Sequence, residues 1–405
     1  MAARFARRLD VMKASEIREL LAITQRPEVI SFAGGLPAPE LFPIEELKAV
    51  VAEGLDREGP RALQYSTTEG LPGLREQIAR RMNFRLGTAV EASGVLVTCG
   101  SQQGLDLTGK VFLDDDDEVL CESPTYMGAI NAFRAYRPRF VEVETDEEGM
   151  VPEDLERSIA GCRRPKLLYV VPNFQNPSGR TWSLERRHAA LDAAARHGLV
   201  VVEDDPYGQL CYEGTTPPAL ASLARSGPVI YLGTFSKIFC PGMRVGWLTA
   251  PREIYQKYVL VKQGADLHTS SLAQWQILAY LERFDLDANV ERIRDVYRRR
   301  RDAMLRALEA EFPPGVTWTH PRGGLFLWAT LPEGVSARDV LVRALERNVA
   351  FVPGGSFFPN GGHENTMRLN FSNMPEERIT EGIARLGAVL RESCVSAGKA
   401  GQAAG

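Results

Sequence analysis

Short runs of apolar, mostly β-branched residues recur along the middle of the chain and predict buried strands. Seven runs cover residues 95–98, 118–121, 140–143, 167–171, 199–202, 229–232 and 245–248. Runs of this length are typical of strands buried on both faces. Helical patterns separate them, such as residues 185–197, which stop at Gly198. The alternation predicts an α/β fold with a mainly parallel, seven-stranded sheet, whose ligands lie at the carboxyl ends of the strands.

The C-terminal third of the chain has a different pattern. It predicts a long amphipathic helix over residues 287–312, strands at 324–328 and 367–371, and a helix over 335–348. We therefore expect a large domain over residues 46–290 and a smaller α+β domain over 291–395. Four consecutive arginines at 298–301 could contact nucleic acid, but flanking acidic residues and the absence of interleaved aromatics favour a solvated helix face. The small, polar segment 396–405 is expected to be disordered.

Composition narrows the class of protein. The 405 residues exceed what one simple core needs, and 44% hydrophobic with 25% charged residues is typical of a soluble globular protein. A net charge of −4 does not favour nucleic acid as a partner, and no apolar run approaches the roughly 20 residues of a membrane span. The six cysteines form no C-x-x-C pair and no metal-ligand spacing with histidine. We expect no metal site, reduced thiols and a cytoplasmic protein.

Lys237 is the first candidate for chemistry. It ends the tetrapeptide Thr234-Phe235-Ser236-Lys237, which follows a predicted strand, so it falls where the sheet should form a crevice. A buried lysine has a lowered pKa and forms Schiff bases with carbonyl compounds. The alternative is a surface lysine after a strand, and the tetrapeptide alone favours that alternative.

Further polar residues follow other predicted strands. Asp204 could pair with a protonated pyridine nitrogen, although Asp204-Asp205-Pro206 is also a common turn. Asn176 could donate its amide hydrogen to a phenolate oxygen, with Tyr207 as a second donor, although Asn-Pro before glycine is also a turn signal.

Residues suited to anions complete the set. Gly100 and Ser101 open a helical pattern after a strand, where backbone amides can bind phosphate, or where serine simply caps a helix. Arg244 could bind a phosphate oxygen, and Arg368 could hold a carboxylate with two parallel hydrogen bonds. Single arginines are usually exposed, so neither is informative alone.

Together these residues resemble the fold-type I enzymes that use pyridoxal 5′-phosphate (PLP), within the class I/II aminotransferases. The ordered motifs are Gly100-Ser101-Gln102, Tyr126, Asn176-Pro177-x-Gly179, Asp204-x-x-Tyr207, Ser236-Lys237, Arg244 and Arg368. These motifs cover essentially the whole chain. Their ordered series is specific for the family, although each motif alone is not. Residues 31–37, 63–66, 262–269 and 351–355 are most similar to the 2-aminoadipate aminotransferases (LysN type), a subgroup that includes kynurenine/aminoadipate aminotransferases.

The resemblance implies a role for each residue. Lys237 holds PLP as a Schiff base and, with Asp204 and Tyr126, is catalytic; Tyr126 stacks on the pyridine ring and Asp204 pairs with its nitrogen. Asn176 and Tyr207 bind the 3-oxygen of the ring, and the Asn176-Pro177 peptide is a candidate for the cis form. The phosphate group is held by Gly100, Ser101, Gln102, Thr234, Ser236 and Arg244. Thr234 stands where serine is commoner in the family.

The resemblance also implies substrates and partners. Arg368 holds the α-carboxylate of the amino acid, while Gly35, Asn176 and Tyr65 line the substrate site. Tyr65 also reaches the cofactor phosphate of a partner subunit, which implies a homodimer with shared active sites. Residues 1–45 form an arm that contributes to the small domain.

Arg18 is the residue expected to choose the substrate. In the LysN-type subgroup its counterpart recognises a distal carboxylate, as in 2-aminoadipate or glutamate; the alternative is an exposed helix arginine paired with Glu16 or Glu19. The expected reaction is a ping-pong transfer of the amino group to a 2-oxo acid such as 2-oxoglutarate. Alternatives are an aromatic or branched-chain aminotransferase of broad specificity, a PLP-dependent β-eliminating lyase, and, remotely, a MocR-type regulator lacking its DNA-binding half.

Overall fold

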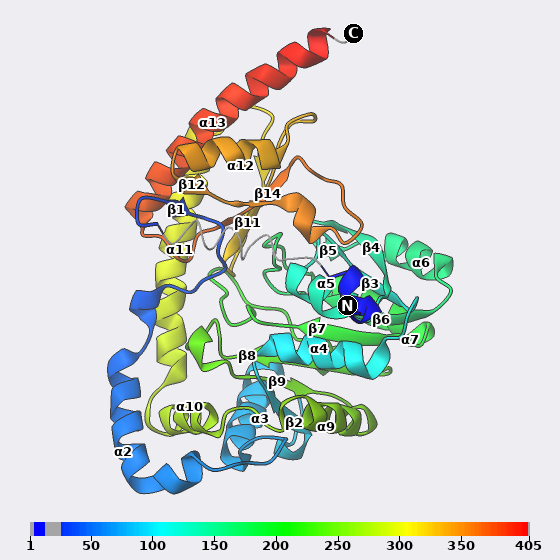
Figure 1. Ribbon diagram of the computed structural model, residues 1–405, viewed down its shortest axis with the longest axis vertical. Helices are drawn as coiled ribbons and strands as arrows, with labels where there is room; N and C mark the ends of the chain where they lie inside the picture. Colours follow the sequence, from blue (N-terminus) through cyan, green and yellow to red (C-terminus); the bar gives the residue numbers. More distant parts are fainter. Residues whose placement is uncertain (1–3, 13–25, 404–405) are drawn as a thin grey trace.

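The computed structural model describes residues 4–12 and 26–403, and an eight-stranded sheet lies at its centre (Figure 1). All seven predicted strands are present, and the eighth, β5, is a two-residue strand that pairs antiparallel with the end of β4. Two residues are too few to leave a recognisable apolar run in the sequence. The strands are β2 (Val95–Thr98), β3 (Glu118–Ser123), β4 (Arg139–Asp146), β5 (Gly149–Met150), β6 (Pro165–Val170), β7 (Val200–Asp204), β8 (Val229–Thr234) and β9 (Gly246–Thr249).

The direction of the strands places six of their carboxyl ends at one edge. The order is β2-β9-β8-β7-β6-β3-β4-β5, and the neighbours from β8 to β4 pair in parallel. β9 is antiparallel to both β8 and β2, so β2 points the same way as β8. The mainly parallel sheet is confirmed, and β2, β3, β4, β6, β7 and β8 all end at the same edge.

Helices cover both faces of this sheet (Figure 1). Leu120 and Leu168 pack in a core with α6 (Pro152–Gly161), α7 (Leu184–Arg196) and α8 (Leu220–Leu223). Val119 and Leu167, one residue earlier on the same strands, pack in the main core with α4 (Ser101–Phe112) and α5 (Met127–Arg134). Because both faces of each strand are buried, the apolar runs in the sequence are continuous rather than alternating.

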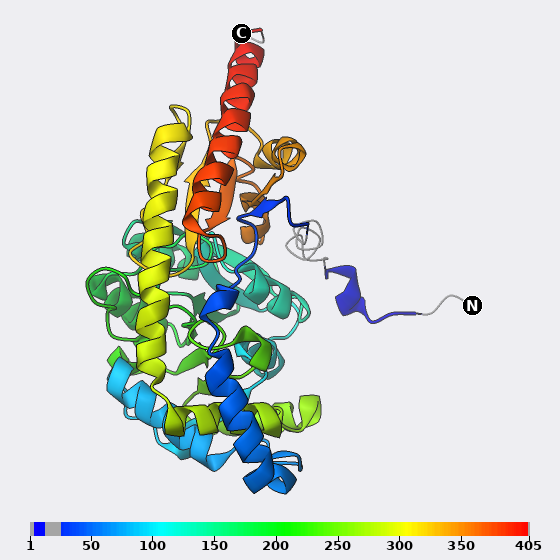
Figure 2. The ribbon, with the colours of Figure 1, turned by 90° about the vertical axis from the view of Figure 1, so that its left-hand side faces the viewer.

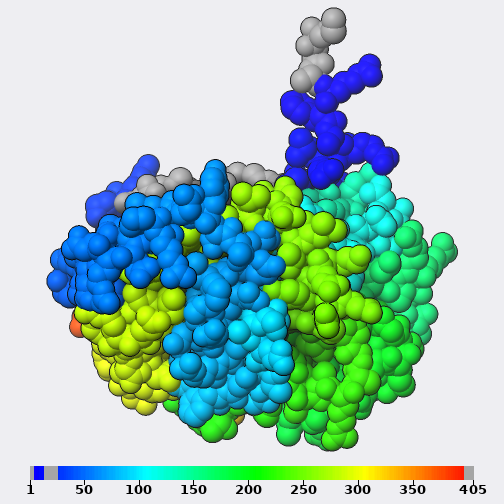
Figure 3. Space-filling model, turned by 90° about the horizontal axis from the view of Figure 1, so that it is seen from below, coloured from blue at the N-terminus to red at the C-terminus, as the bar shows by residue number. Residues whose placement is uncertain are grey.

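Four helices form a layer beyond β2: α2 (Ile44–Ala62), α3 (Pro72–Leu86), α9 (Arg252–Asp266) and α10 (Ser271–Arg283). Figure 3 shows the blue and yellow-green surfaces of this layer side by side, and residues 4–12 projecting from the body. α2 and α10 approach closely: a Cβ atom at Gly54 would lie 1.3 Å from the Trp275 ring. This layer forms one broad surface of the molecule.

A second, antiparallel sheet has the order β10-β11-β14-β13. Its helices α11 and α13 lie side by side (Figure 2). Near the N-terminus, β1 (Ile30–Ser31) pairs in parallel with β12 (Val349–Ala350), so this segment joins elements of the C-terminal third. The remaining elements are β10 (Thr317–Trp318), β11 (Phe326–Thr330), β13 (Val352–Pro353), β14 (Thr366–Asn370), α11 (Leu286–Glu311), α12 (Ala337–Glu346) and α13 (Glu376–Ala403), with short 3-10 helices η1 (Arg7–Asp10), η2 (Pro39–Leu41), η3 (Ala92–Gly94), η4 (Pro241–Met243) and η5 (Gly354–Phe357).

α13 extends to Ala403. One expectation for the C-terminal third was wrong. The arginines at 298–301 do not all lie on a solvated face: Arg300 and Arg301 are 6% and 4% exposed. Arg300 donates to the Ser372 carbonyl and Arg301 to that of Pro321, and each also pairs with a glutamate. Over residues 4–12 and 26–403, no helix has the length and apolarity of a membrane span.

Candidate active site

A cavity of about 260 Å³ opens at the edge where the parallel strands end. It collects residues that follow β2, β3, β6, β7 and β8, which are far apart in the sequence. Twelve of the predicted site residues line it: Gly35, Ser101, Gln102, Tyr126, Asn176, Asp204, Tyr207, Thr234, Ser236, Lys237, Arg244 and Arg368. Val171, Pro206, Pro241 and Phe326 also line it and were not predicted, since isolated apolar or proline residues carry no sequence signal for a site.

Lys237 is part-buried at the floor of this cavity. Its ammonium donates to the Gly35 carbonyl at 2.7 Å. Burial, followed by the charges of Arg368 and Arg244, lowers the pKa of Lys237 to about 8. Lys237 is therefore not a surface lysine, and near pH 8 much of its amine is neutral and nucleophilic.

Asp204 ends β7 and is 1% exposed. Its Oδ2 accepts a hydrogen bond from the Tyr169 hydroxyl at 3.0 Å, whereas its Oδ1 is buried and has no hydrogen-bond partner in the part of the chain that the structure describes. Burial raises the pKa of Asp204 to about 7. Sequence reasoning missed Tyr169, because a tyrosine inside an apolar strand is indistinguishable from an ordinary core residue.

Arg368 comes from β14 of the second sheet and is 1% exposed. Its guanidinium donates to the Ala33 carbonyl at 2.5 Å and to Asn176 Oδ1 at 2.8 Å, while its Nε has no partner within residues 4–12 and 26–403. Its Cζ lies 4.3 Å and 5.1 Å from the ring centres of Phe326 and Phe357. Burial lowers the pKa of Arg368 to about 10. A buried guanidinium with a free donor and no carboxylate partner is suited to an anionic ligand.

Asn176 and Tyr207 meet above β6 and β7. The Asn176-Pro177 peptide is cis, as expected. Burial raises the pKa of the Tyr207 hydroxyl, and a hydrogen bond with the Asn176 side chain opposes that rise. The two groups therefore approach each other closely enough to bind one ligand oxygen together.

The anion-binding corner of the cavity is formed around Gly100. This residue has φ +71°, a backbone conformation that favours glycine, and a Cβ atom there would lie 2.5 Å from Arg244 Nη2, so a larger residue would displace that guanidinium. Ser101 and Gln102 begin α4 directly afterwards, where backbone amides have no helical partners. The Thr234 hydroxyl donates to Ser236 Oγ at 2.9 Å at the end of β8.

Two of the predicted residues that the structure describes, Gly100 and Tyr65, do not line the cavity, although Gly100 directly precedes the lining residue Ser101. Tyr65 is 78% exposed and contacts the His268 ring edge-on, with 5.8 Å between ring centres. Arg18 lies outside the described residues.

Comparison with known proteins identifies the family. The sequence profile of aminotransferase class I and II matches residues 37–386. The chain belongs to this family. It is 49% identical over 383 residues to 2-aminoadipate transaminase of Thermus thermophilus, covering 94% of each chain. It is 44% identical to aromatic-amino-acid aminotransferase 1 of Thermococcus litoralis, covering 94% of this chain and 92% of that one.

A solved structure shows the same fold. LysN, the α-aminoadipate aminotransferase of Thermus thermophilus complexed with N-(5′-phosphopyridoxyl)-L-leucine, superposes with a TM-score of 0.90 at 47% identity, over 96% of this chain and 98% of that one. The fold-type I architecture, transaminase activity and PLP as cofactor, all expected from the resemblance, are confirmed.

The cavity of this aminotransferase fits PLP. Nine buried side-chain polar atoms have no hydrogen-bond partner among the described residues, and two of them, Asp204 Oδ1 and Arg368 Nε, belong to residues lining the cavity. The first can accept the proton of a pyridine nitrogen. At the other end, the start of α4, two hydroxyls and Arg244 match a phosphate group. Lys237 lies among them with an amine of lowered pKa.

Tyr126 precedes α5 and also lines the cavity. Burial, and then the charge of Asp204, raise the pKa of its hydroxyl to about 12, so it stays protonated near neutral pH. A Cβ atom at Gly128 would lie 2.4 Å from the Tyr126 ring, so this glycine leaves room for the ring. The position suits a ring that covers one face of a flat ligand.

Proposed function

We propose that this aminotransferase moves the amino group of an acidic L-amino acid, 2-aminoadipate or glutamate, to a 2-oxo acid such as 2-oxoglutarate. The observation that carries the proposal is the charge of the cavity: Lys237, Arg244 and Arg368 line it, against the single carboxylate of Asp204. Such a site suits a phosphate together with carboxylate substrates. The 49% identity to a 2-aminoadipate transaminase supports the choice of donor.

Each cavity residue has a proposed role in holding PLP. Lys237 bonds its aldehyde carbon and Asp204 its ring nitrogen. Asn176 and Tyr207 bind the ring oxygen, and Tyr126 covers the ring. The phosphate group lies against the backbone of Gly100, Ser101 and Gln102 and the side chains of Thr234, Ser236 and Arg244.

Substrate binding uses the opposite side of the cavity. The free Nε and the terminal nitrogens of Arg368 bind the α-carboxylate, which replaces the poorer carbonyl contact with Ala33. Gly35 lies next to Phe326, since a Cβ atom there would be 2.9 Å from that ring, and this leaves room for the amino acid backbone.

The chemistry divides between cofactor and protein. Bound PLP supplies an electron-withdrawing ring that stabilises the negative charge left when Cα loses its proton. Lys237 Nζ would be freed when the amino group of the substrate takes its place on the aldehyde carbon. It would then take the Cα proton and later release it, acting first as a base and then as an acid. Asp204, kept anionic by a cationic partner, holds the ring nitrogen protonated throughout. Because the first product leaves before the second substrate binds, the kinetics are ping-pong.

A homodimer with shared active sites forms part of the proposal. Tyr65 is 78% exposed, and the apolar residues Leu63 (67%) and Leu260 (63%) are exposed as well; burial of such side chains is favourable. Residues 4–12 project from the body (Figure 3), as an arm that reaches a partner would. Tyr65 would then contribute to the phosphate and substrate sites of the second subunit.

The domain division and the location of the protein are proposed on simpler grounds. Pairing of β1 with β12 supports an arm over residues 1–45 that joins a small domain over 291–395, beside a large domain over 46–290. The six cysteines are free thiols, which suits a cytoplasmic protein.

A second candidate function is a broad-specificity aminotransferase for aromatic and branched-chain donors. The observation in its favour is the 44% identity to an aromatic-amino-acid aminotransferase. Both candidate functions use the same cofactor site. They differ in the residues that contact the side chain of the amino acid substrate.

A donor panel distinguishes the two candidates. Relative kcat/KM is measured with 2-aminoadipate, glutamate, leucine and phenylalanine, with 2-oxoglutarate as acceptor, for the wild type and Arg18→Ala. If Arg18 binds a distal carboxylate, the variant loses about tenfold or more with the two acidic donors and little with the others. An equal loss with every donor, or no loss, would remove the role of Arg18. A wild type that prefers phenylalanine and leucine would favour the second candidate.

A further inference from the structure

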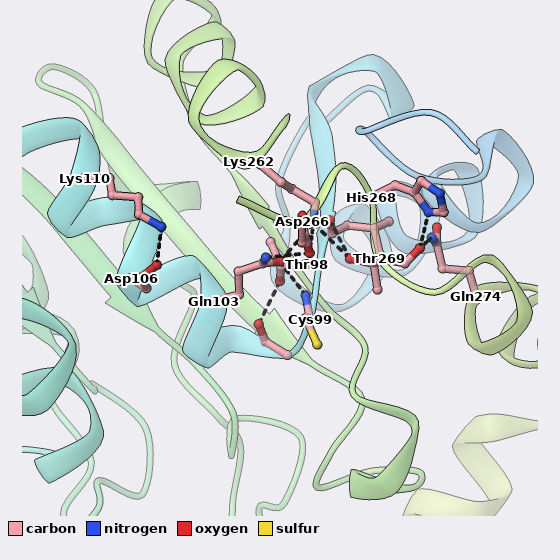
Figure 4. Close-up of polar contacts among 12 residues, drawn as sticks. Thr98, Cys99, Gln103, Asp106, Lys110, Lys262, Asp266, His268, Thr269 and Gln274 are labelled. Atoms are coloured by element: carbon pink, nitrogen blue, oxygen red, sulfur yellow. Dashed lines mark hydrogen bonds and ion pairs between the residues drawn. The ribbon is translucent and has the colours of Figure 1, made fainter. Parts of the chain in front are cut away.

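A cluster behind the phosphate corner contains a fully buried charge that the proposed mechanism does not use (Figure 4). Lys262, on α9, has no exposed surface. Its ammonium donates to both carboxylate oxygens of Asp266, at 2.8 Å and 2.9 Å, to Gln103 Oε1 at 2.9 Å and to the Thr269 hydroxyl at 3.2 Å. A buried ammonium is stable only when its donors are satisfied in this way. Lys262 does not line the cavity.

Gln103 connects this charge to the cavity. Its Oε1 accepts from both Lys262 and the backbone N–H of Cys99, the latter at 2.8 Å, and its Nε2 donates to Asp266 at 2.6 Å. These three contacts fix the orientation of the amide group. Cys99 directly precedes Gly100, so the hydrogen bond from its N–H sets where the left-handed turn begins and where the amides of Ser101 and Gln102 point.

The same cluster reaches the segment that carries Tyr65. Thr269 accepts at its carbonyl from His268 Nδ1 at 2.9 Å and from Gln274 Nε2 at 2.8 Å. His268 in turn accepts from the Ser66 N–H at 3.2 Å, and Gln274 accepts from the Leu71 N–H at 2.9 Å. The turn at residues 99–102 and the segment at 62–71 are therefore held by one continuous set of hydrogen bonds.

We propose that Lys262 is a positioning residue for cofactor binding, which acts through Gln103 to hold the phosphate-binding turn at residues 99–102 without touching the phosphate. The inference rests on the proposed assignment of this turn to the PLP phosphate. A turn held in its binding geometry loses no further conformational freedom when phosphate binds, so affinity rises. Loss of the hydrogen bonds of Lys262 and Gln103 therefore lowers the affinity for the phosphate group alone. The contacts to the pyridine ring are unchanged.

The test compares PLP with pyridoxal, which has the same aldehyde and ring but no phosphate. The full chain, freed of cofactor, is titrated with each compound, and the absorbance of the adduct with Lys237 gives the dissociation constant. We expect Lys262→Met and Gln103→Ala to weaken PLP binding by about tenfold, with the constant for pyridoxal changed less than about twofold. An unchanged PLP constant in Gln103→Ala, or an equal loss for both compounds, would overturn the inference.

Three further variants test whether Lys262 acts through Gln103. Gln103→Ala leaves the pair between Lys262 and Asp266 intact, so it serves if Lys262→Met fails to fold. Lys257→Met removes an exposed lysine from the same helix and should leave both constants unchanged. The double variant of Lys262 and Gln103 should lose no more than the more affected single variant, whereas additive losses would contradict a route through Gln103.

Arg244→Ala separates this inference from the site assignment. It removes a side chain proposed to bind the phosphate directly, and it should weaken PLP but not pyridoxal. If Arg244→Ala shows no phosphate-specific loss, the proposed phosphate site is wrong. If it shows one and Gln103→Ala does not, only the role of Lys262 is wrong.

Discussion

Two lysines, the buried Lys262 and the part-buried Lys237, lie in opposite electrostatic surroundings in this aminotransferase. Lys262 has a carboxylate, an amide oxygen and a hydroxyl within hydrogen-bond distance, which satisfy all its donors. Lys237 has one carbonyl partner, and the charges that lower its pKa are the cations Arg368 and Arg244. Around Lys237, Asp204 and Arg368 each keep a buried atom without a partner.

This difference shows how a polar cluster that supports a site differs from one that binds a ligand. A polar cluster that is satisfied within the protein rigidifies its surroundings and needs no ligand. A cluster with buried, unpartnered atoms costs stability until a ligand supplies the missing partners. Asp204 ends β7 and Arg368 lies on β14, and both line the cavity. The satisfied cluster lies outside the cavity lining and is joined through Gln103 to Cys99, at the start of the phosphate-binding turn.

The largest expected effect follows from removing the lysine of the unsatisfied cluster. Lys237→Ala removes the only amine among the described residues that line the cavity, so kcat should fall by at least about 10³-fold. Steady-state assays with glutamate and a 2-oxo acid measure this, with Lys257→Ala as the control on an exposed site. Near-normal turnover of Lys237→Ala would falsify the assignment.

The next effect concerns the unpartnered donor of Arg368. Lysine keeps the positive charge but cannot offer two parallel donors, so Arg368→Lys should raise KM about 100-fold for every amino donor. The measurement is KM across acidic and apolar donors, with Arg306→Lys on the exposed face of α11 as control. A rise confined to acidic donors would show that Arg368 binds the side chain instead of the α-carboxylate.

The third effect is on the pH dependence of stability and not on turnover. The pKa of Asp204 is raised from 3.8 to about 7 on folding, so the cofactor-free chain loses stability as pH rises from about 4 to 7, and the cost persists above 7. Asparagine carries no charge and can still accept from Tyr169. Asp204→Asn should therefore be more stable than the wild type by about 4 kcal/mol at pH 8 and nearly equal to it near pH 4.

Denaturant unfolding of the cofactor-free chains at the two pH values checks this. Added PLP should reverse the order at pH 8, because its ring nitrogen supplies the missing partner to the wild type alone. A difference that is the same at both pH values would contradict the pKa change as its cause.

Much of the fold followed from local patterns. The seven apolar runs became β2–β4 and β6–β9 because strands buried on both faces must be continuously apolar. β5, β10, β12 and β13 were not predicted, because strands of two residues depend on pairing partners rather than on their own composition. Tyr169 and Lys262 were missed as functional residues for a related reason: burial and partners give them their roles.

The sequence by itself determined the family, the order of the cofactor-binding motifs and the strands that carry them, because these features depend only on residue type and spacing. Only the tertiary structure decided which charges are satisfied. Arg368 and Lys237 are 131 residues apart in the sequence and meet in one cavity because β14 is brought against the edge of the large sheet. Whether a buried charge has a partner depends on such long-range contacts. These contacts decide that the cluster around Lys237 is left to bind a ligand, whereas the cluster around Lys262 is satisfied within the protein and supports the site.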